Sequence, residues 1–292
     1  MSYSISSDKF QDPLLKPILV SLSNYFSSVD VDFYVIGATA RDIVLNFHGE
    51  KSGRATRDLD IAIAISNWEE FETIEQGIVN IKGFKKDSNQ KQRFYYQDNF
   101  ELDIVPFGDI MKEGDKVFWP PDEQVAMSVL GFKEVAKATD KFQIDNGVEI
   151  EVASLVGVFI LKLVAWQDRN NQTNKDADDI AFIISNYFNI NQERAIAEYS
   201  EIMFEDDDFS FEKAGALLIG IDVALLLGNS DYIINKLIKI VEIEIDKLEE
   251  SVLINQIIET NSNFNYEETL SCLMNFIRGV NANQEGEITD NI

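Results

Sequence analysis

The chain has 292 residues, of which 45% are hydrophobic and 26% are charged, enough for one large or two modest globular domains. The formal net charge is −26 and unevenly spread, at −9 over residues 1–150 and −17 over residues 151–292, so the second half is poorly suited to gripping a nucleic-acid backbone. A single cysteine, Cys272, excludes an intramolecular disulfide.

The first half of the chain predicts helices that alternate with strands. Residues 11–28 have helical spacing, and an apolar strand at 32–37 ends at Gly37. Helical spacing then returns, with Thr39 able to cap the helix. The elements expected next are a polar loop at 48–57, a buried strand at 58–65, a helix capped by Ser66, a hairpin around Asn99, a turn at 120–123 and a hairpin around Asn146-Gly147.

The second half is predicted to be helical almost throughout. The expected helices are 154–168, opened by Ser154, and then 176–187, 191–204, 211–228, 230–249 and 264–279. Two apolar stretches, interrupted by Lys162 and Asp222, are shorter than the ~20 residues of a membrane-spanning helix, so we interpret both as buried helices. The first 20 residues lack a charged segment followed by an apolar one, so we expect no signal peptide and a cytoplasmic protein.

The order of these elements predicts an α/β (α+β) fold with two parts. Residues 1–153 form a core with a mixed sheet, and residues 154–282 form a helical domain, a C-terminal bundle. The polar, acidic end at 283–292 is expected to be a disordered tail.

Three aspartates are the candidate catalytic residues. Asp58 and Asp60 are two apart in a predicted strand and therefore point to the same face. Asp103 lies in a second apolar strand, "ELDIVP", and would join them if the two strands are neighbours. Oxygen-only clusters of this kind suit Mg²⁺ or Mn²⁺, and two such ions clamp the oxygens of a phosphoryl reaction. Solvated aspartates at a strand end are the alternative for an isolated Asp-x-Asp pair.

The Gly37-Ala38 turn indicates which ligand those cations would bind. A narrow turn of small residues lets backbone N–H groups approach a triphosphate closely, and the following helix N-terminus favours the anion. Neither a Walker A motif nor Gly-x-Gly-x-x-Gly is present, which excludes a P-loop and a dinucleotide-binding fingerprint.

The segments "YVIGATARDIVL", "TRDLDIAIAI" and "ELDIVPFG" together resemble the nucleotidyltransferase core of the DNA polymerase β superfamily. Within it, the chain is most similar to the AbiEii/AbiGii toxin family of nucleotidyltransferases, often the toxin half of a toxin–antitoxin pair. The resemblance covers roughly residues 30–185 and not the acidic helices beyond. It departs from the family at Ala38, where the family has Gly or Ser, so only backbone contacts to phosphate remain there.

The resemblance continues through "LKLVAWQDRNNQTNKDADDI", which is similar to the family's Lys…Asp-Arg…Lys-Asp-x-x-Asp segment. The residues that it carries over are Lys162, Asp168, Arg169, Lys175, Asp176 and Asp179. Lys162 lies within an apolar helix, where its ammonium could face a cleft and meet phosphates or could snorkel to water. The resemblance implies that Lys162, Lys175, Asp176 and Asp179 contribute to nucleotide binding.

Basic residues around the turn are further candidates for phosphate binding. Arg41, Arg54 and Arg57 surround the turn and the polar loop, and residues 82–93 form a basic segment with five Lys or Arg against one Asp. A solvated loop is the alternative for the basic segment. We expect any RNA contact to come from these two places and not from the acidic second half.

Together these observations predict an Mg²⁺-dependent (or Mn²⁺-dependent) nucleotidyltransferase that moves NMP from an NTP to a hydroxyl of RNA, such as tRNA, or of protein. The nucleotide would bind at Gly37, Ala38, Thr39, Arg41 and Arg57. Asp58 and Asp60 would hold the metals, and Asp103 would complete the second metal site and help to deprotonate the acceptor. The resemblance implies a toxin with an antitoxin protein as partner.

Two alternatives remain open from the sequence. "VIGATARDIVL" also resembles the Gly-Gly-x-x-Arg-Asp segment of CCA-adding enzymes, which would make the protein an RNA-tailing enzyme, although no basic RNA-binding tail is evident. The other alternative is a non-catalytic module that binds nucleotide, or that binds a protein through its acidic helices.

Overall fold

A computed structural model describes residues 2–51, 56–121, 123–124, 126–205, 208–228 and 230–284. Contacts within the chain group it into two compact units, residues 1–154 and 155–292. Each unit is described below by itself. Arg54 and residues 285–292 of the expected tail lie outside the described residues, whereas residues 283 and 284 belong to the last helix.

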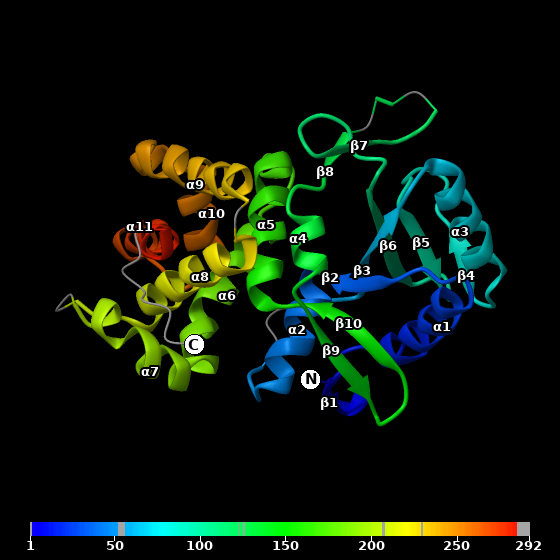
Figure 1. Ribbon diagram of the computed structural model, residues 1–292, viewed down its shortest axis with the longest axis horizontal. Helices are drawn as coiled ribbons and strands as arrows, with labels where there is room; N and C mark the ends of the chain where they lie inside the picture. The colour runs from blue at the N-terminus through cyan, green and yellow to red at the C-terminus, as the bar shows by residue number, and fades with distance from the viewer. Residues whose placement is uncertain are drawn as a thin grey trace. The chain divides into compact units, whose positions relative to one another are not determined.

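The first unit is built on an eight-stranded mixed sheet, which confirms the predicted fold class (Figure 1). The strand order is β1-β9-β10-β2-β3-β6-β5-β4, with parallel pairing at β1–β9, β10–β2 and β3–β6 and antiparallel pairing elsewhere. The strands are β1 (Ser2–Ile5), β2 (Phe33–Ile36), β3 (Asp58–Ile65), β4 (Phe84–Lys86), β5 (Arg93–Tyr96), β6 (Phe100–Gly108), β9 (Thr139–Ile144) and β10 (Glu149–Ala153). A separate ribbon pairs β7 (Lys116–Phe118) with β8 (Ala126–Ser128).

Period-two patterning explains the two faces of the central strand β3. Leu59, Ile61 and Ile63 are completely buried on one face, and Asp58 and Asp60 alternate with them on the other. The helices of this unit are η1 (Ser7–Lys9), α1 (Leu15–Ser28), α2 (Gly37–Phe47), α3 (Trp68–Asn80) and α4 (Phe132–Ala136). Helices α1 and α3 pack against each other, and α3 also packs along β4 (Figure 1).

Both predicted hairpins are confirmed. Strands β5 and β6 pair antiparallel across the turn that contains Asn99, and β9 and β10 pair antiparallel across Asn146-Gly147. Asp145 and Asn146 adopt positive φ angles of 50° and 56°, which Asn and Asp tolerate better than most residues.

Two predicted helix caps are wrong. Helix α3 is capped by Asn67, whose side chain accepts from the Glu70 backbone N–H, while Glu70 accepts from the backbone N–H of Ser66. Helix α2 begins at Gly37, two residues earlier than expected, so Thr39 lies inside the first turn and does not cap it.

The second unit is a bundle of helices, as predicted (Figure 1). Its elements are α5 (Leu155–Arg169), α6 (Lys175–Ile190), α7 (Gln192–Met203), α8 (Phe211–Leu227), α9 (Asp231–Asp246), η2 (Leu248–Glu250), α10 (Val252–Thr260) and α11 (Tyr266–Gln284). The sequence prediction missed α10. No helix in the described part of the chain is long and apolar enough to span a bilayer.

Glycine allows close approach of the helices around α8. A Cβ added at Gly220 would lie 2.1 Å from the Phe276 carbonyl oxygen of α11, and one added at Gly279 would lie 2.1 Å from the Leu217 oxygen. Gly215 contacts α6 in the same way, with 2.4 Å to the Ile184 oxygen. The backbones of α6, α8 and α11 therefore touch where no side chain fits.

We expect Gly220→Ala to lower the stability of the protein by about 1–3 kcal/mol, because the added methyl group must push α8 and α11 apart. Alanine favours a helix over glycine by up to about 1 kcal/mol, so propensity alone would change stability in the opposite direction. Thermal or urea unfolding measures the change. Leu225→Ala, at an exposed position of the same helix, is the control and should have little effect. A Gly220→Ala protein as stable as the wild type would contradict the packing described here.

Candidate functional site

The turn between β2 and α2 places a carboxylate against a glycine. Gly37 has φ +68°, and a Cβ built on it would lie 2.3 Å from the Asp60 Oδ2. The side chain of Asp60 therefore lies against the N-terminus of α2, where the N-cap residue Ile36 supplies no side-chain hydrogen bond. Uncapped N–H groups and the positive end of the helix dipole both favour an anion at this position.

Four carboxylates share one face of the sheet beside this turn. Parallel pairing of β3 with β6 sets Asp58 opposite Glu101 and Asp60 opposite Asp103. The predicted convergence of the three aspartates thus follows from the strand register. Like charges directly opposite each other on neighbouring strands repel, so this face needs positive charge.

Arg93 on β5 supplies positive charge at one end of this row. Antiparallel pairing places Arg93 opposite Asp103, and its Nε and Nη2 donate to the two Asp103 carboxylate oxygens, each at 2.8 Å. Its Nη1 lies 2.7 Å from Glu101 Oε2. Hydrogen bonds to charged groups contribute about 1.5–3 kcal/mol each, so this bidentate pair is a firm contact. The hydrogen bond to Asp103 raises the pKa of Arg93, which keeps the guanidinium charged.

The sequence analysis did not identify Arg93 or Glu101 as site residues. Arg93 was included only in the basic segment at 82–93. The available signal was the hairpin around Asn99, because its register sets Arg93 opposite Asp103.

Asp60 lies against the glycine turn, whereas Asp103 is bound by Arg93. Mg²⁺ commonly binds through one or two carboxylates, waters and substrate phosphates, and the carboxylates of Asp58 and Asp60 lie beside the turn that favours phosphate. Both Asp103 oxygens accept from Arg93. Over the described ranges of the chain, no group of three or more His, Cys, Asp or Glu side chains is arranged to hold a metal ion.

Thr39 and Arg41 both make hydrogen bonds from the first half of α2. The Thr39 hydroxyl donates to the Asp58 carbonyl oxygen at 2.8 Å, which fixes the start of β3 to the first turn of α2. The Arg41 side chain is fully buried, and its Nε and Nη2 donate to Asp42 Oδ1 at 2.8 and 2.7 Å. Both residues were predicted to bind nucleotide, and the structure shows each of them in a contact within the first unit.

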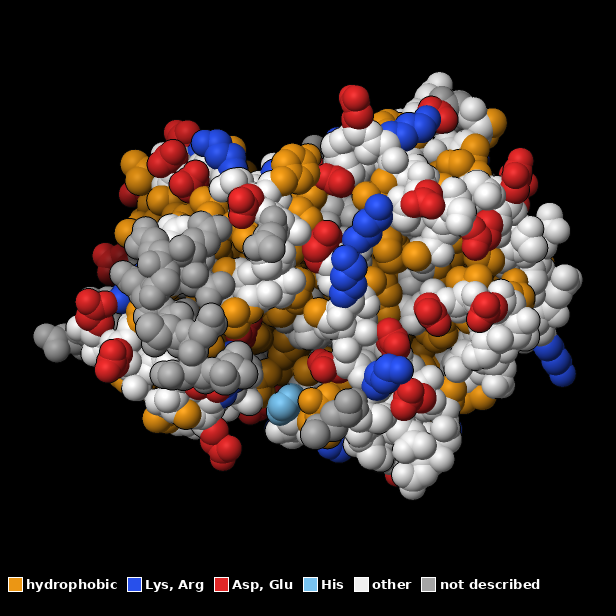
Figure 2. Space-filling view, viewed as in Figure 1, with side chains coloured by type: hydrophobic (Ala, Val, Ile, Leu, Met, Phe, Trp, Pro, Cys, Tyr) orange, Lys and Arg blue, Asp and Glu red, His pale blue; other side chains and the backbone are white. Residues whose placement is uncertain are grey.

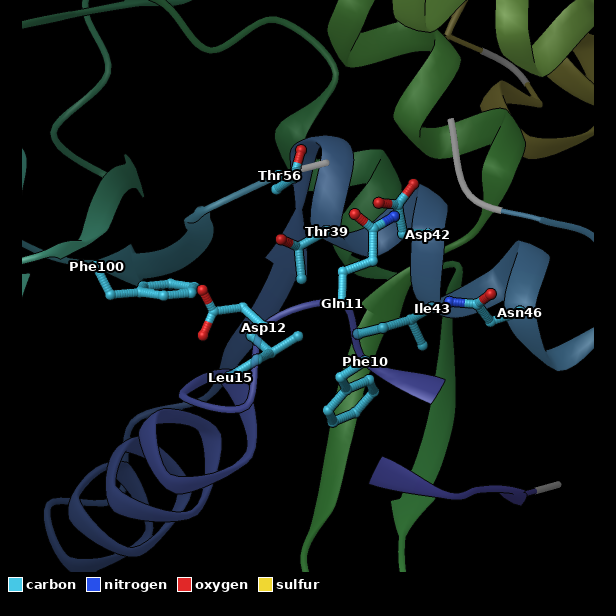
Figure 3. Close-up of a pocket in the computed structure, with 10 residues that line it drawn as sticks. All are labelled: Phe10, Gln11, Asp12, Leu15, Thr39, Asp42, Ile43, Asn46, Thr56 and Phe100. Atoms are coloured by element: carbon cyan, nitrogen blue, oxygen red, sulfur yellow. The ribbon is translucent and has the colours of Figure 1, made fainter. Parts of the chain in front are cut away.

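The other predicted residues of the turn differ in exposure. Ala38 is 5% exposed, whereas the side chain of Arg57, immediately before β3, is exposed. A small cavity of about 20 Å³ lies next to the turn and is lined by Thr39, Asp42 and Thr56 among others (Figure 3). It has room for about one water and cannot hold a nucleotide.

In the second unit, Lys162 lies between two buried carboxylates. Its Nζ is 3.0 Å from Asp176 Oδ1 and 2.6 Å from Asp179 Oδ2, and both aspartates are completely buried. Arg169 Nε and Nη2 donate to the two oxygens of Asp176 at 2.6 and 2.8 Å. The lysine therefore does not snorkel but joins α5 to α6 through ion pairs. A role of this cluster in nucleotide binding stays a prediction, as does that of Lys175, which is exposed at the start of α6.

The basic segment at 82–93 is only partly a solvated loop, because two strands flank an exposed connection at 88–91. It contains β4 and the start of β5, which pair antiparallel. Lys85 Nζ is 2.5 Å from Asp98 Oδ1, and Lys86 forms an ion pair with Glu75. Acidic side chains are spread over the visible surface, and the single histidine, His48, is exposed there (Figure 2). Cys272 is buried, and burial raises the pKa of its thiol, as expected for an inert residue.

The family model for "Nucleotidyl transferase AbiEii toxin, Type IV TA system" matches residues 21–250 of the chain. No curated protein matches the chain.

Three solved structures show a distant likeness. The antibiotic-resistance factor ANT(2'')-Ia is 13% identical with a TM-score of 0.36, over 66% of this chain and 96% of its own. A CCA-adding enzyme with CTP is 13% identical with a TM-score of 0.26, over 96% and 84%. The CD-NTase CdnG of Bradyrhizobium diazoefficiens in complex with GTP is 14% identical with a TM-score of 0.24, over 98% and 94%. These TM-scores are all below 0.5, so the likenesses support no functional argument.

We expect the Lys162 cluster to stabilise the protein in a pH-dependent way. Burial opposes ionisation of Asp176, but the Arg169 hydrogen bond and the Lys162 charge outweigh it and lower its pKa from 3.8 to about 2. A carboxyl with a lowered pKa in the folded state contributes stability above its unfolded pKa and loses it as the pH falls toward the folded value. The contribution is about 2 kcal/mol above pH ~4 and disappears between pH ~4 and ~2.

Urea unfolding of the wild type and of Asp176→Asn between pH 6 and pH 3 measures this contribution. The difference in the free energy of unfolding should be constant near pH 6 and should shrink below pH 4. Glu267→Gln, which removes an exposed carboxylate from α11, is the control and should show no such trend. A pH-independent difference for Asp176→Asn would mean that the ion pairs are not its source.

Proposed function

The chain belongs to the AbiEii nucleotidyltransferase toxin family, and on this premise we propose that it transfers NMP from an NTP to a hydroxyl acceptor with the help of Mg²⁺. Nucleotidyl transfer in general follows from the family. To this the proposal adds Mg²⁺ as the metal, Asp58 and Asp60 as the residues that hold it, and a hydroxyl of RNA or protein as the acceptor. One observation carries it, namely the carboxylate of Asp60 against Gly37 at the N-terminus of α2, with Asp58 on the same face of β3.

The proposed division of work follows from that geometry. The first turn of α2 binds the phosphates through backbone N–H groups alone. Ala38 has no side-chain hydroxyl that could donate a further hydrogen bond. Thr39 fixes this turn to the start of β3, which positions Asp58 and Asp60. These two aspartates would hold Mg²⁺, which would neutralise negative charge on the phosphates. The acceptor hydroxyl gives up its proton to solvent as its oxygen forms a bond to the α-phosphorus, and the bond to the leaving pyrophosphate breaks.

The acceptor is proposed to be a hydroxyl of RNA, such as tRNA, or of protein, and the protein is proposed to act as a toxin with an antitoxin as partner. Incubation with each labelled NTP, Mg²⁺ and a cell extract, followed by separation of RNA from protein, identifies the acceptor. Label on either fraction supports transfer. Absence of label from both, with all four NTPs, would favour a non-catalytic nucleotide-binding module.

We expect Asp58→Asn and Asp60→Asn each to lower the rate of transfer by at least about 100-fold, because each removes a charged oxygen ligand from the proposed site. Neither change should unfold the protein, since each removes one of several repelling charges. Asp109→Asn, at an exposed position just after β6, is the matched control and should retain activity. Full activity of both site variants would refute the assignment.

We also expect Mg²⁺ and NTP together to raise the melting temperature more than either does alone. A metal that bridges carboxylates and phosphates binds only the folded state and stabilises it by mass action. Differential scanning fluorimetry with millimolar NTP measures the shift. Asp60→Asn should remove the additional shift, and a wild-type protein without any shift would count against a nucleotide site.

A further inference from the structure

Three phenylalanine side chains are exposed where α7 ends and α8 begins. Phe204, Phe209 and Phe211 are 48%, 39% and 50% exposed, although phenylalanine is usually buried. Their rings contact one another, with centroids 5.1 Å apart for Phe204 and Phe209 and 5.7 Å apart for Phe209 and Phe211. Together they form one apolar surface, which we call the phenylalanine patch. Single apolar residues are ordinary on a protein surface, but contiguous ones mark interaction sites.

The patch is supported from within the second unit. The ring of Phe188 on α6 is 2% exposed, stacks on Phe211 at 5.7 Å and lies 5.7 Å from Phe209. Ser210, between two residues of the patch, caps α8 by accepting from the Lys213 backbone N–H at 3.1 Å. Side chains that are already held in place lose little conformational freedom on binding. The patch is therefore preorganised for contact with another molecule.

The sequence around the patch is acidic. Residues 201–212 contain six Asp or Glu and no Lys or Arg. Two basic side chains pair with this segment, Lys213 with Asp208 and Arg278 with Glu205. Six negative charges still exceed these two positive ones, so a molecule that covers the apolar rings is favoured if it brings positive charge to their edge.

This charge distinguishes among the possible occupants of the patch. A second copy of the chain would bring the same acidic segment against itself. Residues 285–292, at the end of the chain, carry three acidic residues and no basic one. An anionic lipid surface and a nucleic acid are repelled for the same reason. A basic protein segment with apolar side chains fits both the rings and the charge.

We propose that the phenylalanine patch is the docking surface for a protein partner that presents apolar side chains flanked by Lys and Arg, as one face of a cationic amphipathic helix does. The aromatic rings supply the apolar contact area, and the acidic segment orients the partner and speeds its association. This inference is independent of the proposed transfer reaction, because it concerns a surface of the second unit.

The test uses the full chain and a fluorescein-labelled peptide of leucine and lysine, about 15 residues long, with its leucines at helical spacing. Fluorescence anisotropy measures binding. We expect the peptide to bind the wild type, and Phe204→Ser and Phe211→Ser each to weaken its affinity by at least about tenfold, because each removes an apolar contact. A peptide with serine in place of leucine, or with glutamate in place of lysine, should bind at least about tenfold more weakly than the leucine–lysine peptide.

Leu225→Ser is the matched control. Leu225 is 52% exposed on the same helix as Phe211, about 20 Å away along the helix axis, and its substitution should change the affinity by less than about twofold. Phe211 stacks on Phe188, so Phe211→Ser could lower stability, and circular dichroism checks that each variant is folded. Phe204→Ser gives a separate readout if Phe211→Ser does not fold, because the described ring contact of Phe204 is with Phe209.

Failure of the wild type to bind the leucine–lysine peptide overturns the inference, as does equal affinity of the wild type and the folded phenylalanine variants. Equal binding of the leucine–glutamate peptide would mean that charge plays no part and overturns it too. Sedimentation of the chain alone and binding to phosphatidylcholine vesicles examine the other occupants. A dimer, or vesicle binding, that is lost in Phe204→Ser would assign the patch to a second copy or to a membrane in place of a basic partner.

Discussion

Repulsion among carboxylates on one face of the sheet is the constraint on which the first unit depends. Parallel pairing of β3 with β6 aligns Asp58 with Glu101 and Asp60 with Asp103, and two unit charges 4 Å apart interact by about 4 kcal/mol at a partly buried site. The fold provides positive potential at both ends of this row. Strand β5 brings Arg93 against Asp103, and the β2–α2 turn brings a helix N-terminus against Asp60. Strand β5 therefore has to pair with β6 on the side away from β3, so that Arg93 reaches Asp103. Helix α2 has to begin at a glycine, so that Asp60 fits against it.

The second unit meets the same constraint in a different way. Lys162 and Arg169 face Asp176 and Asp179, so two positive charges balance two negative charges within the cluster. Breaking a buried ion pair is costly, because it leaves one charge without a partner. The row of four carboxylates and Arg93 on β3, β6 and β5 instead sums to −3. An excess of negative charge favours a cation, and this contrast is the reason for proposing the metal site on the sheet.

Period-two alternation and turn chemistry made much of the first unit predictable. They gave the shared face of Asp58 and Asp60, the two hairpins and the glycine turn before α2. The sequence did not reveal Arg93, because its importance depends on a register that brings it opposite a residue ten positions later. Nor did it reveal how Lys162 is paired, since its partners lie one turn apart on another helix. Short elements such as β4 and α10 were missed because their patterns are too brief to distinguish from loops.

The same pairing of charges bears on how such an acidic protein could handle a polyanion. In the hairpin of β4 and β5, Lys85, Lys86 and Arg93 each have a carboxylate partner, and a phosphate backbone laid across them would have to displace those partners. The α2 turn offers a different means of binding phosphate, because backbone N–H groups and a helix dipole carry no net charge and need no counter-ion. The proposed binding of a single nucleotide at this turn would therefore not require a basic surface, which a chain with a net charge of −26 provides poorly. A nucleic-acid acceptor would therefore make few phosphate contacts through Lys85, Lys86 and Arg93, and its affinity for them would depend little on salt.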